Sequence, residues 1–430
     1  MKDDIPTGRL KRGLAGGKTA ARVGKKILTY YTKRPFLTAA GRLQAKEQAT
    51  LEGAQALFQG LSLLKGTALK MAQQLSLEVN LLPEGACREL ARAYHQVPPI
   101  NRALVRQVVQ TGLGRSLEET FAQFNTVAFA AASLGQVHRA VSMDGQSLAI
   151  KIQYPGIAKT IEGDVDLIRR LLGPLIPDKH LIPTIDEIAA RLHEEVDYLQ
   201  EAENLNFFFD SLQMDGINIP QVHPELTSCT VLTTTLMHGK PLDLWLAGSP
   251  PQQARDSVAQ LLNELLTQSL YNLHTIHADP NPGNFIIGDD GTIGLVDFGC
   301  VKRFTPTVVE HYRQLTVAAA HQDSETHFQL MITLGLIPSE LDQAIIVKVR
   351  ELSDAMCRWY GRLYAEEWFD FRMHPQMMAE GWKIMRGYQH LRNYFLVNPD
   401  LIFLDRTRYG LLRIFEMLGA RVGFRNIHEW

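Results

Sequence analysis

The alternation of apolar and polar residues predicts helices in the N-terminal quarter of the chain. Small and apolar side chains recur at alternating steps of three and four, which places them on one side of a helix or helix pair. The members of this stripe are Ala54, Leu57, Leu61, Leu64, Ala68, Met71 and Leu75. Lys70 and Gln73 are three residues apart and lie off the stripe, so both can project in one direction. Taken alone, they are also typical of the solvated face of an amphipathic helix.

Short β-rich runs follow. Residues 129–140 read as a small-residue loop and then a strand, and Met143-Asp144-Gly145 is a turn before the strand that ends at Lys151. Another strand is predicted over residues 230–237. Later, two short apolar runs flank an Asp-Gly turn over residues 288–291, which predicts a hairpin.

Two further helices are predicted. One covers residues 185–209 and carries an acidic cluster. At about 100° per residue, Asp197 and Glu201 share one face of this helix, while Glu195 lies well round from both. The other covers residues 409–418 and ends at Gly419, a residue typical of a helix C-terminus.

Length and composition allow two lobes and a helical addition. The 430 residues have ordinary apolar and charged fractions. Four cysteines without a Cys-x-x-Cys spacing indicate a reducing compartment and no zinc site. No secretory signal is visible, and polar residues interrupt the uncharged stretch over residues 120–138, so we expect a cytoplasmic protein without a membrane span.

The first 34 residues form a basic arm. Ten lysines and arginines against Asp3 and Asp4 give this arm a charge of about +8, and the rest of the chain about −10. Such an arm can bind nucleic acid or an anionic membrane surface, and otherwise is a soluble flexible tail. Leu10, Leu14 and Val23 interleave with the basic residues, which favours the membrane surface. We therefore expect peripheral attachment, at the inner membrane if the protein is bacterial, and no nucleic-acid partner.

Residues 277–299 carry candidate phosphoryl-transfer chemistry. The segment reads His-Ala-Asp-Pro-Asn-Pro-Gly-Asn, then, after twelve residues, Asp-Phe-Gly. Phosphoryl transfer needs one carboxylate near the attacking oxygen, and an amide and a second carboxylate to hold Mg²⁺. Asp279, Asn284 and Asp297 stand at those places, and the predicted hairpin would bring Asp297 beside Asn284. Either motif alone is ordinary turn chemistry, but both in this order with a hairpin between them favour catalysis.

Upstream residues supply a candidate nucleotide site. Lys151 ends a strand as a phosphate-binding lysine does in a kinase small lobe. Where a glycine-rich loop would cover the phosphates, the chain has Ala130, Ala131, Ala132 and Ser133. Each added Cβ stiffens the backbone, so this lid would disfavour transfer to a large acceptor. The strand over residues 230–237 would meet adenine through Thr235 and Met237.

Together these segments resemble the UbiB/AarF-type atypical kinases, the ADCK group in eukaryotes. The resemblance runs from about Pro6 nearly to the C-terminus. Its motifs are Ala130 to Ser133, Lys151-Ile152-Gln153-Tyr154-Pro155-Gly156, Glu195-x-Asp197-Tyr198-x-x-Glu201-Ala202-x-Asn204, Asp279-Pro280-Asn281-Pro282 and Asp297-Phe298-Gly299. The family's Lys-x-Gly-Gln motif corresponds to Lys70 to Gln73, with Ala72 in place of the glycine.

The resemblance implies an α+β, protein-kinase-like two-lobed fold, with an N-terminal helical extension packing over the active-site cleft. It implies that Glu201 pairs with Lys151, that Lys70 reaches Glu195, and that Asp197 lies near the metal. ATP and Mg²⁺ are the implied cofactors. The implied process is ubiquinone biosynthesis, with its enzymes or lipid precursors as partners, and the activity is ATP hydrolysis or phosphoryl transfer to an unidentified acceptor.

The expected layout has four parts. A basic arm covers residues 1–45, a helical extension 46–115, a small lobe 116–238 and a large lobe 239–430. Two alternatives stay open. Small-molecule phosphotransferases of the aminoglycoside or choline kinase kind have a similar Asp-x-x-x-x-Asn loop but lack the extension with Lys70 and Gln73. A pseudokinase scaffold would bind nucleotide without turnover.

Overall fold

The computed structural model of the chain divides into two compact units. The first comprises Met1–Ala202 and Val222–Leu236, and the second Glu203–Gln221 and Met237–Trp430. The residues that the structure describes are 17, 21, 24, 29–30, 32, 34–38, 41–42, 45, 48, 52–53, 56, 67–68, 70–71, 101–132, 134–173, 181–388, 391, 394–396 and 398–430. Most of the basic arm, Ala72, Gln73 and Ser133 therefore lie outside the described residues.

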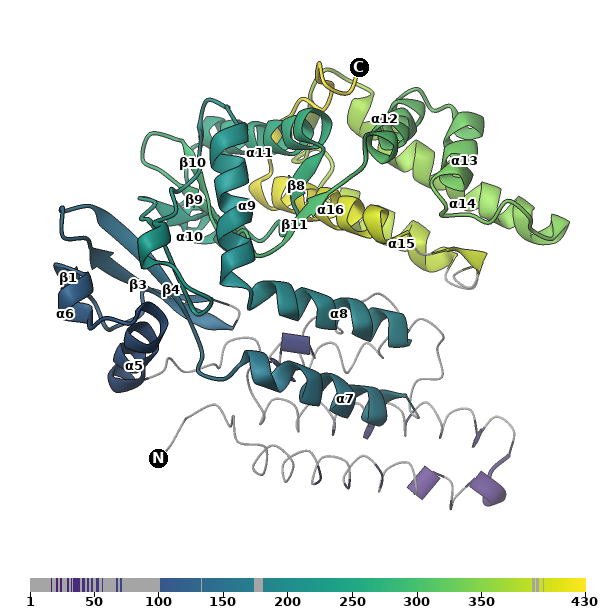
Figure 1. The fold of residues 1–430 in the computed structure, drawn as a ribbon. Coiled ribbons are helices and arrows are strands. Elements are labelled where there is room, and N and C mark those ends of the chain that lie inside the picture. Colours follow the sequence, from purple (N-terminus) through teal and green to yellow (C-terminus); the bar gives the residue numbers. More distant parts are fainter. Residues whose placement is uncertain are drawn as a thin grey trace. The chain divides into compact units, whose positions relative to one another are not determined.

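The first unit contains an antiparallel sheet (Figure 1). Its strand order is β1-β3-β4-β6, and β2 also pairs with β3. The strands are β1 (Gln123–Phe124), β2 (Ala130–Ala132), β3 (Gly135–Val141), β4 (Ser147–Gln153) and β6 (Val231–Thr235). The predicted turn between β3 and β4 is present, and Gly145 takes a φ of 91° there, which glycine adopts without steric cost.

Helix α5 (Arg102–Leu113) covers this sheet. Its inward side chains Val105 and Val109 are buried against Leu148 and Ile150 of β4. The helix approaches β6 closely, because a Cβ added at Gly112 would lie 2.9 Å from Val231. Alternation along β4 thus places apolar side chains in this core, as expected for a strand with one face buried.

The long helix predicted over residues 185–209 is wrong, because the chain forms two helices there. Helix α8 (Leu181–Glu195) ends before Asp197, and α9 (Tyr198–Ser211) begins after it. The Asp197 carboxylate accepts a hydrogen bond from the Gln200 N–H at 3.1 Å, which caps the N-terminus of α9. Glu195 therefore lies on a different helix from Glu201, so the angle expected between these two on a single helix does not apply. Asp197 keeps its helical relation to Glu201, because the Glu201 N–H donates to the Asp197 carbonyl at 3.0 Å.

Short strands in the second unit carry the predicted hairpin. Strands β9 (Phe285–Ile287) and β10 (Ile293–Leu295) pair antiparallel, as predicted, and belong to a sheet ordered β5-β10-β9-β7. The Gly291 φ of 82° fits the Asp-Gly turn. The other strands of this unit are β5 (Ile217–Asn218), β7 (Lys240–Pro241), β8 (Thr275–His277) paired with β11 (Val301–Arg303), and β12 (Phe369–Asp370) paired with β13 (Arg421–Val422).

Helices make up most of the second unit, and the last of them is longer than expected. Helix α16 spans Pro399–Leu418, so it begins well before the predicted residue 409, and it ends at Gly419 with a φ of 55°. The remaining helices here are α10 (Leu242–Ala247), α11 (Gln252–Leu273), α12 (Pro306–Ala320), α13 (Ser324–Thr333), α14 (Gln343–Gly361) and α15 (Met377–Gly387). The first unit adds α6 (Leu117–Thr120) and α7 (Ile161–Leu172), and 3₁₀ turns lie at Arg34–Phe36, Ala158–Thr160, Pro224–Leu226, Pro282–Asn284 and Arg362–Tyr364.

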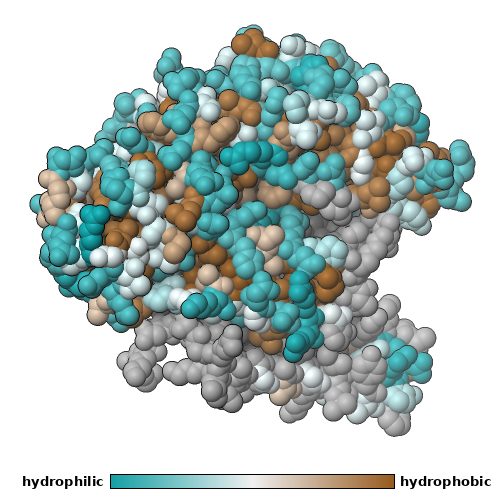
Figure 2. Space-filling model, viewed as in Figure 1, coloured by the Kyte–Doolittle hydropathy of each residue, from teal (hydrophilic) through white to brown (hydrophobic). Residues whose placement is uncertain are grey.

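None of the helices within the described ranges has the length and apolar character needed to cross a membrane. Hydrophilic residues cover much of the face shown in Figure 2, and apolar residues form smaller areas among them. Exposed apolar residues that occur singly are normal for a folded protein.

Candidate active site

The first unit joins a strand lysine to a helix glutamate. Lys151 Nζ on β4 lies 2.7 Å from Oε1 and 2.8 Å from Oε2 of Glu201, which stands in the first turn of α9. Glu201 is only 2% exposed. The lysine nitrogen also lies over the Tyr198 ring, 5.3 Å from its centroid. These contacts hold the ammonium group in one position, as a phosphate-binding lysine requires.

The alanine segment differs from expectation. Ala130, Ala131 and Ala132 form strand β2 and pair with β3, whereas the sequence suggested a loop. Ala130 and Ala131 are exposed. Ser133, the last residue assigned to this segment, lies outside the described residues. The hairpin pairing restrains the alanine backbone further than the Cβ atoms alone would.

The two residues expected to meet adenine fall in different units. Thr235 ends β6 in the first unit and is partly exposed. Met237 belongs to the second unit, where it packs against β10, because a Cβ added at Gly294 would lie 3.1 Å from the Met237 Cβ.

A second lysine–glutamate pair joins the N-terminal extension to the end of α8. Lys70 Nζ lies 3.2 Å from Glu195 Oε1, and the two side chains are 21% and 20% exposed. Nearby, the buried Thr67 hydroxyl bonds to Asp164 of α7 and lies 2.9 Å from the Thr160 hydroxyl. The role of Thr67 was not predicted from the sequence, because a threonine beside an apolar helical stripe carries no local signal of a distant carboxylate partner.

The candidate catalytic loop lies in the second unit. It follows β8 and contains the turn Pro282–Asn284. The Asn284 amide donates to Asp279 Oδ2 at 2.9 Å and to the Asp279 carbonyl at 3.2 Å. The Val296 N–H donates to the Asn284 carbonyl at 3.0 Å, so the hairpin returns the chain beside Asn284 one residue before Asp297.

Asp297 is held in an uncommon conformation. Its φ is 63°, in the left-handed region that costs a non-glycine residue free energy. His277 Nε2 donates to the Asp297 carbonyl at 2.8 Å, and the Asn204 amide donates to the next carbonyl, that of Phe298, at 3.1 Å. The Phe298 ring is fully buried and lies 5.2 Å from the ring of Phe208. Contacts on both carbonyls therefore offset the strain at Asp297.

The donor atoms here suit Mg²⁺. Asn284 offers an amide oxygen and Asp297 a carboxylate, and Mg²⁺ in phosphoryl-transfer sites combines one or two such ligands with phosphate oxygens and water. No cluster of three or more His, Cys, Asp or Glu side chains stands ready to hold a metal by itself in the described part of the chain. The residues fit a metal that arrives with a nucleotide, and Asn284 and Asp297 could hold it.

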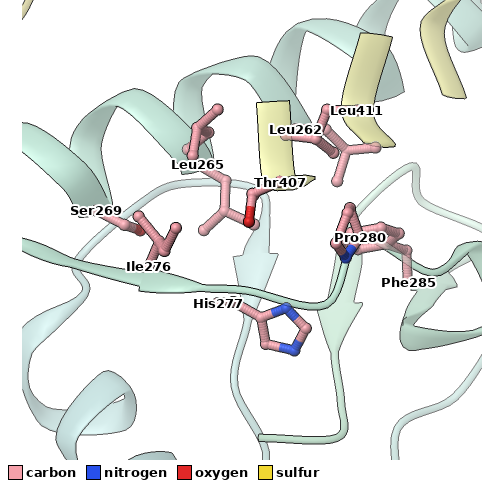
Figure 3. A pocket seen from close by; sticks show the side chains of 10 residues that line it. Leu262, Leu265, Ser269, Ile276, His277, Pro280, Phe285, Thr407 and Leu411 are labelled. Atoms are coloured by element: carbon pink, nitrogen blue, oxygen red, sulfur yellow. The ribbon is translucent and has the colours of Figure 1, made fainter. Parts of the chain in front are cut away.

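A cavity under the candidate catalytic loop is too small for a nucleotide (Figure 3). Its volume is about 20 Å³, which is room for about one water molecule. It is lined by Leu262, Leu265, Leu266, Ser269, Ile276, His277, Pro280, Phe285, Thr407 and Leu411. Helices α11 and α16 therefore pack directly beneath the loop, and the sequence offered no indication that α16 does so.

The fold and these side chains define a kinase-like protein of the atypical class. Residues 92–331 match the ABC1 atypical kinase-like domain, and the chain belongs to this family. The resemblance drawn from the motifs is thereby confirmed. The probable serine/threonine-protein kinase abkA of Dictyostelium discoideum is 28% identical over 78% of this chain and 63% of its own length. The mitochondrial atypical kinase coq-8 of Caenorhabditis elegans is 29% identical over 98% of this chain and 56% of its own length.

This chain thus spans about three fifths of the length of these two relatives. The mitochondrial atypical kinase COQ8 of Saccharomyces cerevisiae is 28% identical over 77% of this chain and 67% of its own length. Among solved structures, the complex of Rv3197 with erythromycin from Mycobacterium tuberculosis matches with a TM-score of 0.60 and 25% identity, over 89% of this chain and 96% of that chain. The kinase-like α+β fold predicted from the sequence is confirmed.

Proposed function

We propose that this protein is a Mg²⁺-ATP-dependent atypical kinase-type enzyme. Its reaction is ATP hydrolysis or phosphoryl transfer to an acceptor not yet identified. The observation that carries the proposal is the Lys151–Glu201 pair, in which both oxygens of a buried carboxylate hold one ammonium group. A lysine fixed in this way on a central strand is the arrangement by which kinases orient the α- and β-phosphates.

The other residues take complementary roles in this proposal. Lys151 binds the α- and β-phosphates, and Glu201 orients it. Asp279 positions the attacking hydroxyl or water and accepts its proton, while the Asn284 amide holds the carboxylate. When bound, Mg²⁺ neutralises phosphate charge, and Asn284 and Asp297 are the side chains that would hold it. Ala130 to Ser133 cover the phosphates, and Thr235 and Met237 contact adenine.

The biological process in which this protein acts is proposed from the names of its relatives and from the charge of its basic arm. Two of the relatives carry the names coq-8 and COQ8 and are called mitochondrial atypical kinases. We propose that this chain supports ubiquinone biosynthesis, with that pathway's enzymes or lipid precursors as partners. The basic arm, at about +8, would hold it at an anionic membrane surface. Lys70, Gln73, Glu195 and Asp197 would regulate access to the nucleotide.

Phosphate release from Mg²⁺-ATP tests the reaction. We expect turnover by the full chain, with an increase on vesicles that contain anionic lipid compared with neutral vesicles. Asp297→Asn should abolish turnover, because it removes a carboxylate from the metal. Asp289→Asn, in the exposed hairpin turn, is the matched control and should leave turnover unchanged.

Nucleotide binding is measured separately from turnover, by the thermal stability of the protein. At a Mg²⁺-ATP concentration of about 100 Kd, binding should stabilise the protein by roughly 2.7 kcal/mol. An unchanged melting temperature at millimolar Mg²⁺-ATP would contradict the proposal. Stabilisation without phosphate release, even with candidate acceptors, would show a nucleotide-binding scaffold in place of an enzyme.

A further inference from the structure

Helix α16 packs directly on the catalytic loop. A Cβ added at Gly410 would lie 2.2 Å from Cγ and 2.9 Å from Cβ of Pro280, the residue after Asp279. Only glycine allows this approach. Arg406 stands four residues earlier on α16 and so on the same face as Gly410. This helix follows residue 331, where the match to the kinase-like domain ends.

Arg406 reaches the carboxylate that the proposed mechanism uses. Its Nη2 lies 3.5 Å from Asp279 Oδ1, while the Asn284 amide occupies the other oxygen at 2.9 Å. Each oxygen of Asp279 therefore has a donor from a different element, one from the loop and one from α16. The Arg406 and Asp279 side chains are both 32% exposed, so neither is a core residue.

Two donors on opposite oxygens restrict rotation of the carboxylate. The terminal torsion of an aspartate is broad when nothing holds it. A nucleophile must be held near attack geometry, and a displacement of about 1 Å can cost about 100-fold in rate. A guanidinium is suited to this task because its planar fork of donors is always charged and fixed in geometry, whereas a lysine ammonium is a flexible point charge.

We propose that Arg406 is a positioning residue for Asp279, so that the C-terminal helix completes the catalytic site. The inference rests on the proposed function, in which Asp279 orients the attacking group. Arg406 acts through Asp279 and takes no part in holding the nucleotide. Its loss should therefore change kcat and leave nucleotide affinity in place.

The test compares Arg406→Ala and Arg406→Lys with the unaltered full chain. Steady-state ATP turnover on anionic vesicles gives kcat and KM, and calorimetry gives the Kd for Mg²⁺-ATP. We expect Arg406→Ala to lower kcat by about 100-fold, with Kd and melting temperature unchanged. Arg406→Lys should recover only part of the loss. Added guanidinium ion, below denaturing concentrations, should raise kcat of Arg406→Ala and of no other variant.

Arg413→Ala is the matched control, because Arg413 is an exposed arginine on the same helix. It should keep the kcat of the unaltered chain. Equal kcat for Arg406→Ala and Arg413→Ala would overturn the inference. So would a loss in Arg406→Ala that follows a lowered melting temperature and does not respond to guanidinium. Absence of turnover in the unaltered chain would instead contradict the proposed function, and the two failures are thus distinct.

Discussion

Two lysine–glutamate pairs in the first unit use the same chemistry at different depths. Lys151 makes two contacts with Glu201, at 2.7 and 2.8 Å, and Glu201 is 2% exposed. Lys70 lies 3.2 Å from one oxygen of Glu195, and about a fifth of each side chain is exposed. Water can solvate either partner of the second pair if the other moves, whereas it cannot reach Glu201.

The difference in burial makes the Lys151–Glu201 pair a fixed contact and the Lys70–Glu195 pair an adjustable one. The break at Asp197 places Glu195 and Glu201 on separate helices. The Lys70–Glu195 pair can therefore open without rotating the helix that carries Glu201. A pair that stays closed suits a phosphate-binding lysine. A pair that opens at small cost suits an extension that regulates access.

The largest loss of stability is expected from Lys151→Ala. This substitution removes the ammonium group that pairs with a buried carboxylate, which typically costs about 3–5 kcal/mol of unfolding free energy. Urea denaturation without nucleotide measures it, and ATP turnover should be lost as well. A cost similar to that of Lys70→Ala would remove the contrast between the two pairs.

A double-mutant cycle measures the second pair. Lys70→Ala, Glu195→Ala and the double variant should give a coupling energy of about 0.5–1 kcal/mol, since both side chains keep partial access to water. Thermal and urea unfolding supply the four free energies. Strict additivity would show that the extension contact contributes nothing to stability.

Ionic strength should affect the two lysine–glutamate pairs differently. Raising ionic strength to about 1 M shortens the screening length to about 3 Å, which weakens partly exposed pairs and affects buried ones much less. The Lys70–Glu195 coupling should therefore shrink in salt, while a parallel Lys151–Glu201 cycle keeps most of its value. Equal shrinkage in both cycles would mean that Glu201 is as accessible to ions as Glu195.

The smallest effect is expected at the surface. Arg106 and Glu118 form an ion pair whose side chains are 54% and 65% exposed. Arg106→Ala should leave the melting temperature unchanged within error, because exposed pairs contribute little. A clear loss would show that exposure does not rank the ion pairs of this unit.

Local signals explain which features could be predicted from the sequence. The β9–β10 hairpin was predictable because an Asp-Gly turn lies between two β-branched runs. The place of Lys151 on a strand followed from the short apolar run before it. The resemblance supplied its pairing with Glu201, which lies 50 residues away in the chain and which no local pattern indicates.

Tertiary contacts explain the rest. The helix break was missed because its residues form a helix readily, although Asp197 followed by Gln200 is a recognisable capping pattern. The alanine segment became a strand because β3 supplies its hydrogen-bond partners. Arg406 lies 127 residues from Asp279, and its neighbours on α16 carry no motif that would reveal the contact.

Calorimetric titration with Mg²⁺-ATP tests the central claim most directly, namely that Lys151, which pairs with the buried Glu201, binds nucleotide, whereas Lys70, in the partly exposed pair, does not. Lys151→Ala and Lys70→Ala are compared with the unaltered chain at equal protein concentration. Loss of charge-assisted hydrogen bonds to phosphate should weaken Mg²⁺-ATP binding by Lys151→Ala by about tenfold or more. Lys70→Ala should not weaken binding, because it opens the contact of the extension and removes no group that binds phosphate. An unchanged Kd for Lys151→Ala would contradict the account.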